Sequence, residues 1–127
     1  MLTRDQILGA ADFTLEEVDV PEWGGVVAVR TFSGKSRDTL ESLMLAAGGN
    51  ALPDARATVA LLACCDAAGR PLFTKEDLDE LGTRGAAALD RVFKVAVRLN
   101  GLGAAEVDAR LGNSDGAQSA DSGTVSL

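Results

Sequence analysis

One stretch of the sequence decides the fold: Val18-Asp19-Val20-Pro21-Glu22-Trp23-Gly24-Gly25-Val26-Val27-Ala28-Val29-Arg30-Thr31-Phe32-Ser33-Gly34. β-Branched residues flank a centre rich in proline and glycine, where a chain can reverse without steric cost. The stretch therefore predicts a strand, a tight turn and a second strand. Two strands alone are only marginally stable in water. We expect the apolar face of this hairpin to be covered by helices that follow in the chain or by another copy of the protein.

The second strand of the hairpin is apolar on both sides near the turn. Val27, Val29 and Thr31 share one side, and Val26, Ala28, Arg30 and Phe32 share the other. One of the two sides is therefore a candidate for contact with a partner. Trp23, the only tryptophan, lies at the turn, where it could cap the core or anchor an interface. Capping of the core is the favoured interpretation.

The first strand carries an interruption and a surplus of negative charge. The step from Leu15 to Val18 shifts the alternation of apolar residues by one position, which predicts a β-bulge or an irregular entry near Glu16 and Glu17. Up to Glu22, six acidic residues stand against one basic residue, namely Asp5, Asp12, Glu16, Glu17, Asp19 and Glu22 against Arg4. The favoured explanation is a solvated edge kept soluble by like charge, and the alternative is a docking face for a basic partner.

Length, charge and composition limit the classes of function. The chain has 127 residues and a net charge of −7, so we expect one domain and no basic surface that would bind nucleic acid or a membrane. It contains no histidine, which removes the commonest general base and metal ligand. We expect no enzyme, because no catalytic set of residues is assembled, and no cofactor. With no apolar leader and no long apolar run, we expect a cytosolic protein.

Two adjacent cysteines, Cys64 and Cys65, invite a redox or metal interpretation. A disulfide between neighbouring residues closes a strained ring, whereas buried thiols behave as small apolar side chains. A zinc site would need further soft ligands, which the sequence does not supply. Both cysteines are therefore predicted to belong to the core.

The rest of the chain predicts helices. Ser33 or Ser36 can cap a helix with one apolar face, made by Leu40, Leu43, Met44 and Ala47. The apolar run from residue 57 to 67 fits a buried strand or a buried helix, and its alanine content favours the helix. Further helices are expected over residues 3–9, 74–82, 86–100 and 104–111. The fold class is α+β, with an N-terminal hairpin packed on four or five helices over residues 1–111 and a disordered tail over residues 112–127.

Several segments together resemble the tail assembly chaperones of long-tailed bacteriophages. The resemblance rests on four stretches that occur in the expected order between about Phe13 and Leu111. They are Phe13-Thr14-Leu15-Glu16-Glu17-Val18-Asp19-Val20-Pro21-Glu22-Trp23-Gly24-Gly25 leading to Val29-Arg30-Thr31-Phe32-Ser33-Gly34, then Cys65-Asp66-Ala67-Ala68-Gly69-Arg70-Pro71-Leu72-Phe73-Thr74-Lys75-Glu76-Asp77, then Leu89-Asp90-Arg91, and Leu99-Asn100-Gly101-Leu102.

This resemblance implies a function and its partners. Such chaperones bind the long, helical tape measure protein and keep it soluble while tail tube protein subunits polymerise around it. They act in the cytoplasm of the infected bacterial host and are absent from the mature virion. The chain is similar to the short form that some of these proteins have beside a frameshifted longer form. No catalytic residues are implied.

The residues expected to contact the partner lie on the hairpin and on the longest helix: Trp23, Val27, Val29, Phe93 and Val97. A homo-oligomer is left open. Two other classes of function remain as alternatives. One is a structural component of the virion, such as a head-to-tail joining protein or a minor tail protein. The other is a regulatory or antitoxin-like module that binds a basic protein.

Overall fold

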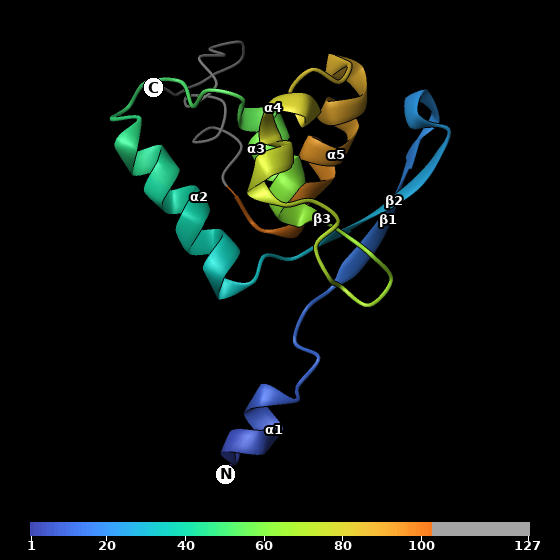
Figure 1. Cartoon of the computed structure of the whole chain (residues 1–127). Coiled ribbons are helices and arrows are strands. Elements are labelled where there is room, and N and C mark those ends of the chain that lie inside the picture. Colours follow the sequence, from blue (N-terminus) through green and yellow to red (C-terminus); the bar gives the residue numbers. More distant parts are fainter. Residues whose placement is uncertain (103–127) are drawn as a thin grey trace.

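A β-hairpin and a short third strand form an antiparallel sheet in the order β1-β2-β3. The computed structural model describes residues 1–102 (Figure 1). Its elements are α1 (Arg4–Leu8), β1 (Leu15–Val20), the 3₁₀ turn η1 (Pro21–Trp23), β2 (Gly25–Arg30), α2 (Gly34–Ala46), α3 (Ala55–Ala63), β3 (Cys64–Cys65), η2 (Lys75–Asp77), α4 (Leu78–Leu81) and α5 (Ala86–Leu99). The predicted α+β class and the N-terminal hairpin are confirmed.

The hairpin reverses through η1, where Pro21 supplies a fixed φ and Gly24 adopts a left-handed conformation with φ of 80°. β1 and β2 then pair without interruption from Leu15 opposite Arg30 to Val20 opposite Gly25. The predicted bulge near Glu16 and Glu17 is therefore wrong.

The reason for the unbroken register lies in α5. Glu16 stands opposite Val29 in the register, so it shares the core-facing side of the sheet with this valine. Its carboxylate accepts a hydrogen bond from Arg98 on α5 and is neutralised there. A charged residue can therefore occupy a core-facing position at the margin of the sheet, and no bulge is needed to turn it away.

The apolar run over residues 57–67 contains both a helix and a strand. The predicted helix is confirmed as α3, which ends at Ala63, but Cys64 and Cys65 turn into β3. They pair with Val29 and Ala28 of β2, respectively. The pairing depends on a strand that lies about 35 residues earlier in the chain, so periodicity within the run itself gave no sign of it.

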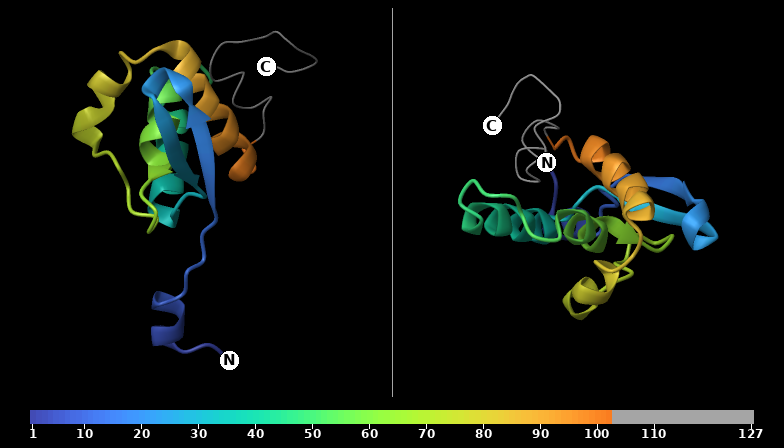
Figure 2. Two further views of the ribbon diagram at one scale, coloured as in Figure 1. Left: turned by 90° about the vertical axis from the view of Figure 1, so that its right-hand side faces the viewer. Right: turned by 90° about the horizontal axis from the view of Figure 1, so that it is seen from above.

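α5 lies across the hairpin, and α3 lies beside α5 (Figure 2). The core forms where these elements meet. Its buried apolar residues are Val18, Val20, Val29, Leu40, Leu52, Ala55, Ala57, Val59, Ala60, Ala63, Cys64, Leu81, Ala88, Leu89, Val92, Phe93 and Ala96. Most of them are valine, alanine or leucine, so the core is built from small side chains.

Side-chain caps begin α2 and α1, and the cap of α2 confirms the prediction from the sequence. Ser33 is the N-cap of α2, and its hydroxyl accepts a hydrogen bond from the N–H of Ser36 at 3.1 Å. Thr3 and Gln6 form a reciprocal capping box at the start of α1. α1 nevertheless stands apart from the rest of the fold and buries none of its residues (Figure 1).

The apolar face predicted for α2 is only partly buried. Leu40 is buried, and Met44 and Ala47 are half-buried, but Leu43 is 40% exposed. α2 lies at the margin of the fold, where α3 and one end of α5 cover it from one side only (Figure 1). The apolar face of α2 is therefore left partly exposed to solvent.

Two further predictions lie outside the described residues, namely the helix over 104–111 and the disordered tail over 112–127. Within residues 1–102, no helix combines the length and the apolar character needed to cross a bilayer.

Candidate partner-binding surfaces

The five residues predicted to contact a partner do not form one accessible patch. Val29 is fully buried and Phe93 is 6% exposed, because both belong to the core. Val27 and Val97 are half-buried and pack against that core. Trp23 is 36% exposed at the turn of the hairpin. Of the five side chains, only Trp23 presents a large surface to solvent.

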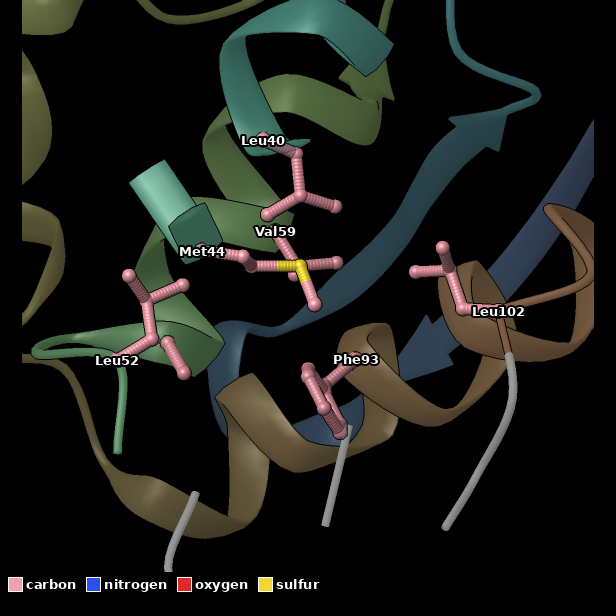
Figure 3. Close-up of a pocket in the computed structure, with 7 residues that line it drawn as sticks. Leu40, Met44, Leu52, Val59, Phe93 and Leu102 are labelled. Carbon is pink, nitrogen blue, oxygen red and sulfur yellow. The ribbon is translucent and has the colours of Figure 1, made fainter. Parts of the chain in front are cut away.

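Phe93 lines a small pocket between α2, α3 and α5 (Figure 3). The cavity measures about 20 Å³, and its walls are the side chains of Leu40, Met44, Leu52, Ala55, Val59, Phe93 and Leu102. A volume of this size is close to that of a single water molecule, and the walls are apolar. The pocket is therefore a gap in the packing of α2 against the core and is too small for an organic ligand.

The turn that carries Trp23 is fastened to α5 by an ion pair. The guanidinium of Arg91 donates to the carboxylate of Glu22 at 2.9 Å. This hydrogen bond holds the pKa of Glu22 below its usual value and raises the pKa of Arg91. Next to the turn, Val26 is 61% exposed on the side of the hairpin that faces away from α5. The tip of the hairpin thus presents an aromatic and an aliphatic side chain on a fixed support.

Two further exposed apolar side chains lie on α2: Leu43, and Leu45, which is 81% exposed and points to a different face of the helix because it is two residues further on. We call these two side chains the α2 leucines. The sequence prediction missed Leu45, because this residue falls outside the apolar stripe of the helix. Its sequence neighbours Met44 and Ala46 are also apolar, so local composition gave no signal for it.

The other exposed apolar side chains are at the N-terminus, on α1 and in the loop after β3: Met1, Leu2, Ile7, Leu8 and Leu72. None of them belongs to the predicted set.

The outer side of the sheet is covered at one end by a cluster of three residues. Arg30 donates to the carbonyl of Gly69 at 2.7 Å, and its guanidinium lies 4.3 Å from the centre of the Phe13 ring. Gly69 has a φ of 85°, and a Cβ at this position would lie 2.5 Å from a Phe13 carbon. Only glycine fits there, so the loop after β3 can close over Phe13.

The carboxylate of Asp66 shapes this loop. Its carboxylate accepts the N–H groups of Ala68 at 2.8 Å and Arg70 at 2.9 Å. The hydrogen bond from the Arg70 backbone is the largest cause of the lowered pKa of Asp66. The acidic group therefore holds a turn together.

The two cysteines are buried and free, as predicted. They are consecutive residues of β3, so their side chains point to opposite sides of the sheet. Burial raises the pKa of Cys64 to about 12, and the neighbouring Cys65 adds to the shift. Burial also raises the pKa of Cys65. Across residues 1–102, no group of three or more cysteine, aspartate or glutamate side chains is placed to hold a metal ion.

Comparison with known proteins gives one informative similarity. No protein-family model and no curated protein matches the sequence. The structure is similar to that of the tail assembly chaperone of bacteriophage HK97, with a TM-score of 0.55 and 24% sequence identity, over 75% of this chain and 90% of that chain. The chain has the fold of this phage tail assembly chaperone. At this level of identity the similarity establishes the fold, and function has to be argued from the surfaces.

Two of the stretches that resemble tail assembly chaperones meet in the structure. Phe13 and Arg30 from the first stretch and Gly69 from the second form the cluster on the outer side of the sheet.

Proposed function

We propose that this chain is a tail assembly chaperone of a long-tailed bacteriophage, which binds the tape measure protein, keeps it soluble and promotes assembly of the tail tube around it. The observation that carries the proposal is the fold shared with the HK97 tail assembly chaperone. The order of the resembling segments in the sequence supports it independently.

The exposed apolar side chains suit such a role. A helical partner is commonly recognised through apolar residues on one helix face, which insert between apolar side chains of the binding protein. The α2 leucines and Trp23 provide contact points of this kind on two sides of the molecule. The net charge of −7 helps to keep a complex with an aggregation-prone partner in solution.

The predicted contact residues have different roles in this proposal. Trp23 contacts the partner directly, and Val27 and Val97 contribute at the margin of the hairpin and α5. Val29 and Phe93 contribute indirectly: both are buried, and their packing fixes the positions of β2 and α5. The α2 leucines are added to the set on the basis of their exposure. In this proposal the protein works in the cytoplasm of the infected host and leaves before the virion is complete.

Co-expression tests the proposal. The large coiled-coil protein encoded next to this chain is produced in bacteria with and without it, and the soluble fraction is measured. We expect the chain to raise the soluble amount and to co-purify with that protein. A virion component would instead remain in purified particles without improving solubility. That result would contradict the chaperone proposal and favour a head-to-tail joining or minor tail protein.

A further inference from the structure

β1 is an edge strand with a free outer side. It pairs with β2 on one side, and within residues 1–102 no strand pairs with the other (Figure 2). The edge is six residues long and regular, with neither a proline nor a bulge along it. Natural proteins use these two features to block an edge against further pairing, and they also use charge, which β1 carries at Glu16, Glu17 and Asp19. β1 therefore keeps a backbone that can accept another strand.

The pairing with β2 identifies the backbone groups that face outward. The N–H of Thr31 donates to the carbonyl of Thr14 at 3.0 Å, which makes this a hydrogen-bonded pair. In an antiparallel ladder, hydrogen-bonded and non-hydrogen-bonded pairs alternate along the strand. Leu15, Glu17 and Asp19 thus belong to non-hydrogen-bonded pairs, and their N–H and C=O groups point away from β2.

The same edge carries two acidic side chains with no ion pair among the described residues. Glu17 and Asp19 are exposed on the side of the sheet that faces away from α5, and Val26 lies opposite Asp19. Asp19 is close enough to Arg91 to raise the pKa of that residue slightly, after the larger effect of Glu22. Glu16 and Glu22, by contrast, are each bound to an arginine of α5.

These charges select the strand that can pair here. A second copy of β1 would bring further carboxylates against Glu17 and Asp19, and like charges on neighbouring strands are destabilising. A strand with Lys or Arg at alternate positions would place opposite charges beside them. Charge repulsion thus disfavours pairing with β1 of a second copy of the chain, and charge attraction favours pairing with a basic strand.

We propose that the outer edge of β1 binds an extended segment of a partner protein in which Lys or Arg alternates with β-branched residues, and that this segment becomes a fourth strand of the sheet. Backbone hydrogen bonds to Leu15, Glu17 and Asp19 supply the binding, and the two carboxylates supply the selectivity. The proposal goes beyond the chaperone function, because it concerns an extended basic segment and a different surface from the α2 leucines.

The probe is a capped heptapeptide, Thr-Lys-Val-Lys-Thr-Lys-Val, and its matched control has Glu in place of each Lys. Each peptide is titrated to about 1 mM, the range of weak complexes, into the ¹⁵N-labelled full-length protein. We expect the lysine peptide to shift the amide signals of Leu15, Glu17 and Asp19 and to slow their hydrogen exchange. The glutamate peptide should leave these signals unchanged.

Variants separate charge from backbone pairing. Glu17→Lys with Asp19→Lys should weaken binding of the lysine peptide by roughly tenfold or more, since two favourable pairs become repulsive. The control is Glu76→Lys with Asp79→Lys, which makes the same change of charge on exposed residues of η2 and α4 and should leave binding unchanged. Glu17→Pro removes one outward N–H, leaves the groups that bond to β2 in place, and should also weaken binding.

Three outcomes would overturn the proposal. The first is the absence of any shift at the highest peptide concentration. The second is equal weakening in the two charge-reversed variants, which would indicate attraction by net charge alone. The third is protection of the edge that rises with protein concentration, which would indicate that copies of this chain pair with each other. Thermal unfolding of each variant verifies that it is folded. Should Glu17→Pro be unstable, the comparison of the two charge-reversed variants alone tests the proposal.

Discussion

α5 and α2 have nearly the same length, but the apolar side of α5 is more sharply defined than that of α2, and the two helices differ in how far the fold buries them. α5 has 14 residues and buries five of them, whereas α2 has 13 residues and buries only Leu40. α5 lies between the hairpin and α3, so neighbours surround its apolar face. α2 has neighbours on one side only, and the α2 leucines remain in solvent. Two helices of nearly equal length thus have different places in the fold, one in the core and one at its margin.

The difference shows that a helix face with apolar residues can be buried, but that the sequence pattern alone does not show whether it is. The fold covers such a face only where the chain places other elements around it. An uncovered stripe has a cost in solubility, and large exposed apolar patches commonly mark sites of interaction. We therefore assign the stability of this protein mainly to α5 and its neighbours, and its capacity for binding to α2 and the tip of the hairpin.

The largest effect is expected from Phe93→Ala in α5. Truncation of a buried aromatic side chain enlarges the cavity between α2, α3 and α5 and should lower the free energy of unfolding by about 3–5 kcal/mol. Urea denaturation followed by circular dichroism measures the change. A loss below about 1 kcal/mol would mean that α5 is not the centre of the core.

The next effect tests the attachment of α2. Leu40→Ala removes the one buried side chain of this helix and should lower the free energy of unfolding by about 2–4 kcal/mol. Other contacts also hold the helix, because Arg37 donates to the carbonyl of Asn100 at 2.8 Å, and Asn100 accepts from the N–H of Phe32. A loss as large as that of Phe93→Ala would show that α2 is as central as α5.

A smaller effect should appear in the dependence of stability on pH, through Cys64. Its pKa is about 12 in the fold and about 8.5 in an unfolded chain. The folded state therefore favours the neutral thiol, and the resulting stability is complete below pH 8.5 and is lost as the pH rises toward 12. The slope should approach about 1.4 kcal/mol per pH unit within this range.

Cys64→Ala is the control for that slope. Denaturation of both proteins at pH 8, 9 and 10 should show a shallower decline in the variant, because one titrating group is gone. Equal slopes would mean that ionisation of Cys64 does not oppose folding. The chain has no tyrosine, so no phenol complicates the comparison.

The surface of α5 should contribute less than its buried side. Lys94, one helical turn after Asp90, binds this carboxylate at 3.0 Å, and Arg56 binds it at 3.2 Å. Burial raises the pKa of Asp90, but the hydrogen bonds from Lys94 and Arg56 outweigh it and leave the pKa below its usual value. The pairs therefore stabilise the fold above about pH 4, and this contribution is lost as the pH falls through the pKa of the folded protein.

Asp90→Asn tests this contribution. At pH 7 the substitution should lower the free energy of unfolding by on the order of 0.5 kcal/mol, with a smaller difference at pH 3. Calorimetry at the two pH values measures both. A loss comparable to that of Leu40→Ala would show that charge on the α5 surface matters as much as burial.

Much of the fold could be predicted, because many of its features are determined by residues that are close together in the sequence. The hairpin, the Ser33 cap, the Asp90–Lys94 pair and α5 are of this kind. The third strand and the unbroken register of β1 could not, because they depend on distant partners. Cys64 pairs with Val29, and Glu16 binds Arg98, far apart along the chain.

The candidate surface was harder to predict than the fold for the same reason. Val29 and Phe93 have the composition of contact residues, but the fold places them in the core. Leu45 has no place in a helical stripe, and only its exposure in the structure makes it a proposed contact residue. Sequence patterns thus select apolar residues well, and the packing of distant elements decides which of them remain accessible.

The most direct measurement compares the wild-type chain with a variant in which Leu43 and Leu45 are both replaced by serine. Leu45 is largely exposed and Leu43 is 40% exposed, so the free energy of unfolding should fall by no more than about 2 kcal/mol. In co-expression with the tape measure protein, the variant should keep much less of that protein in solution. Unchanged solubility of the tape measure protein, with the variant folded as the wild type, would contradict the assignment of binding to α2.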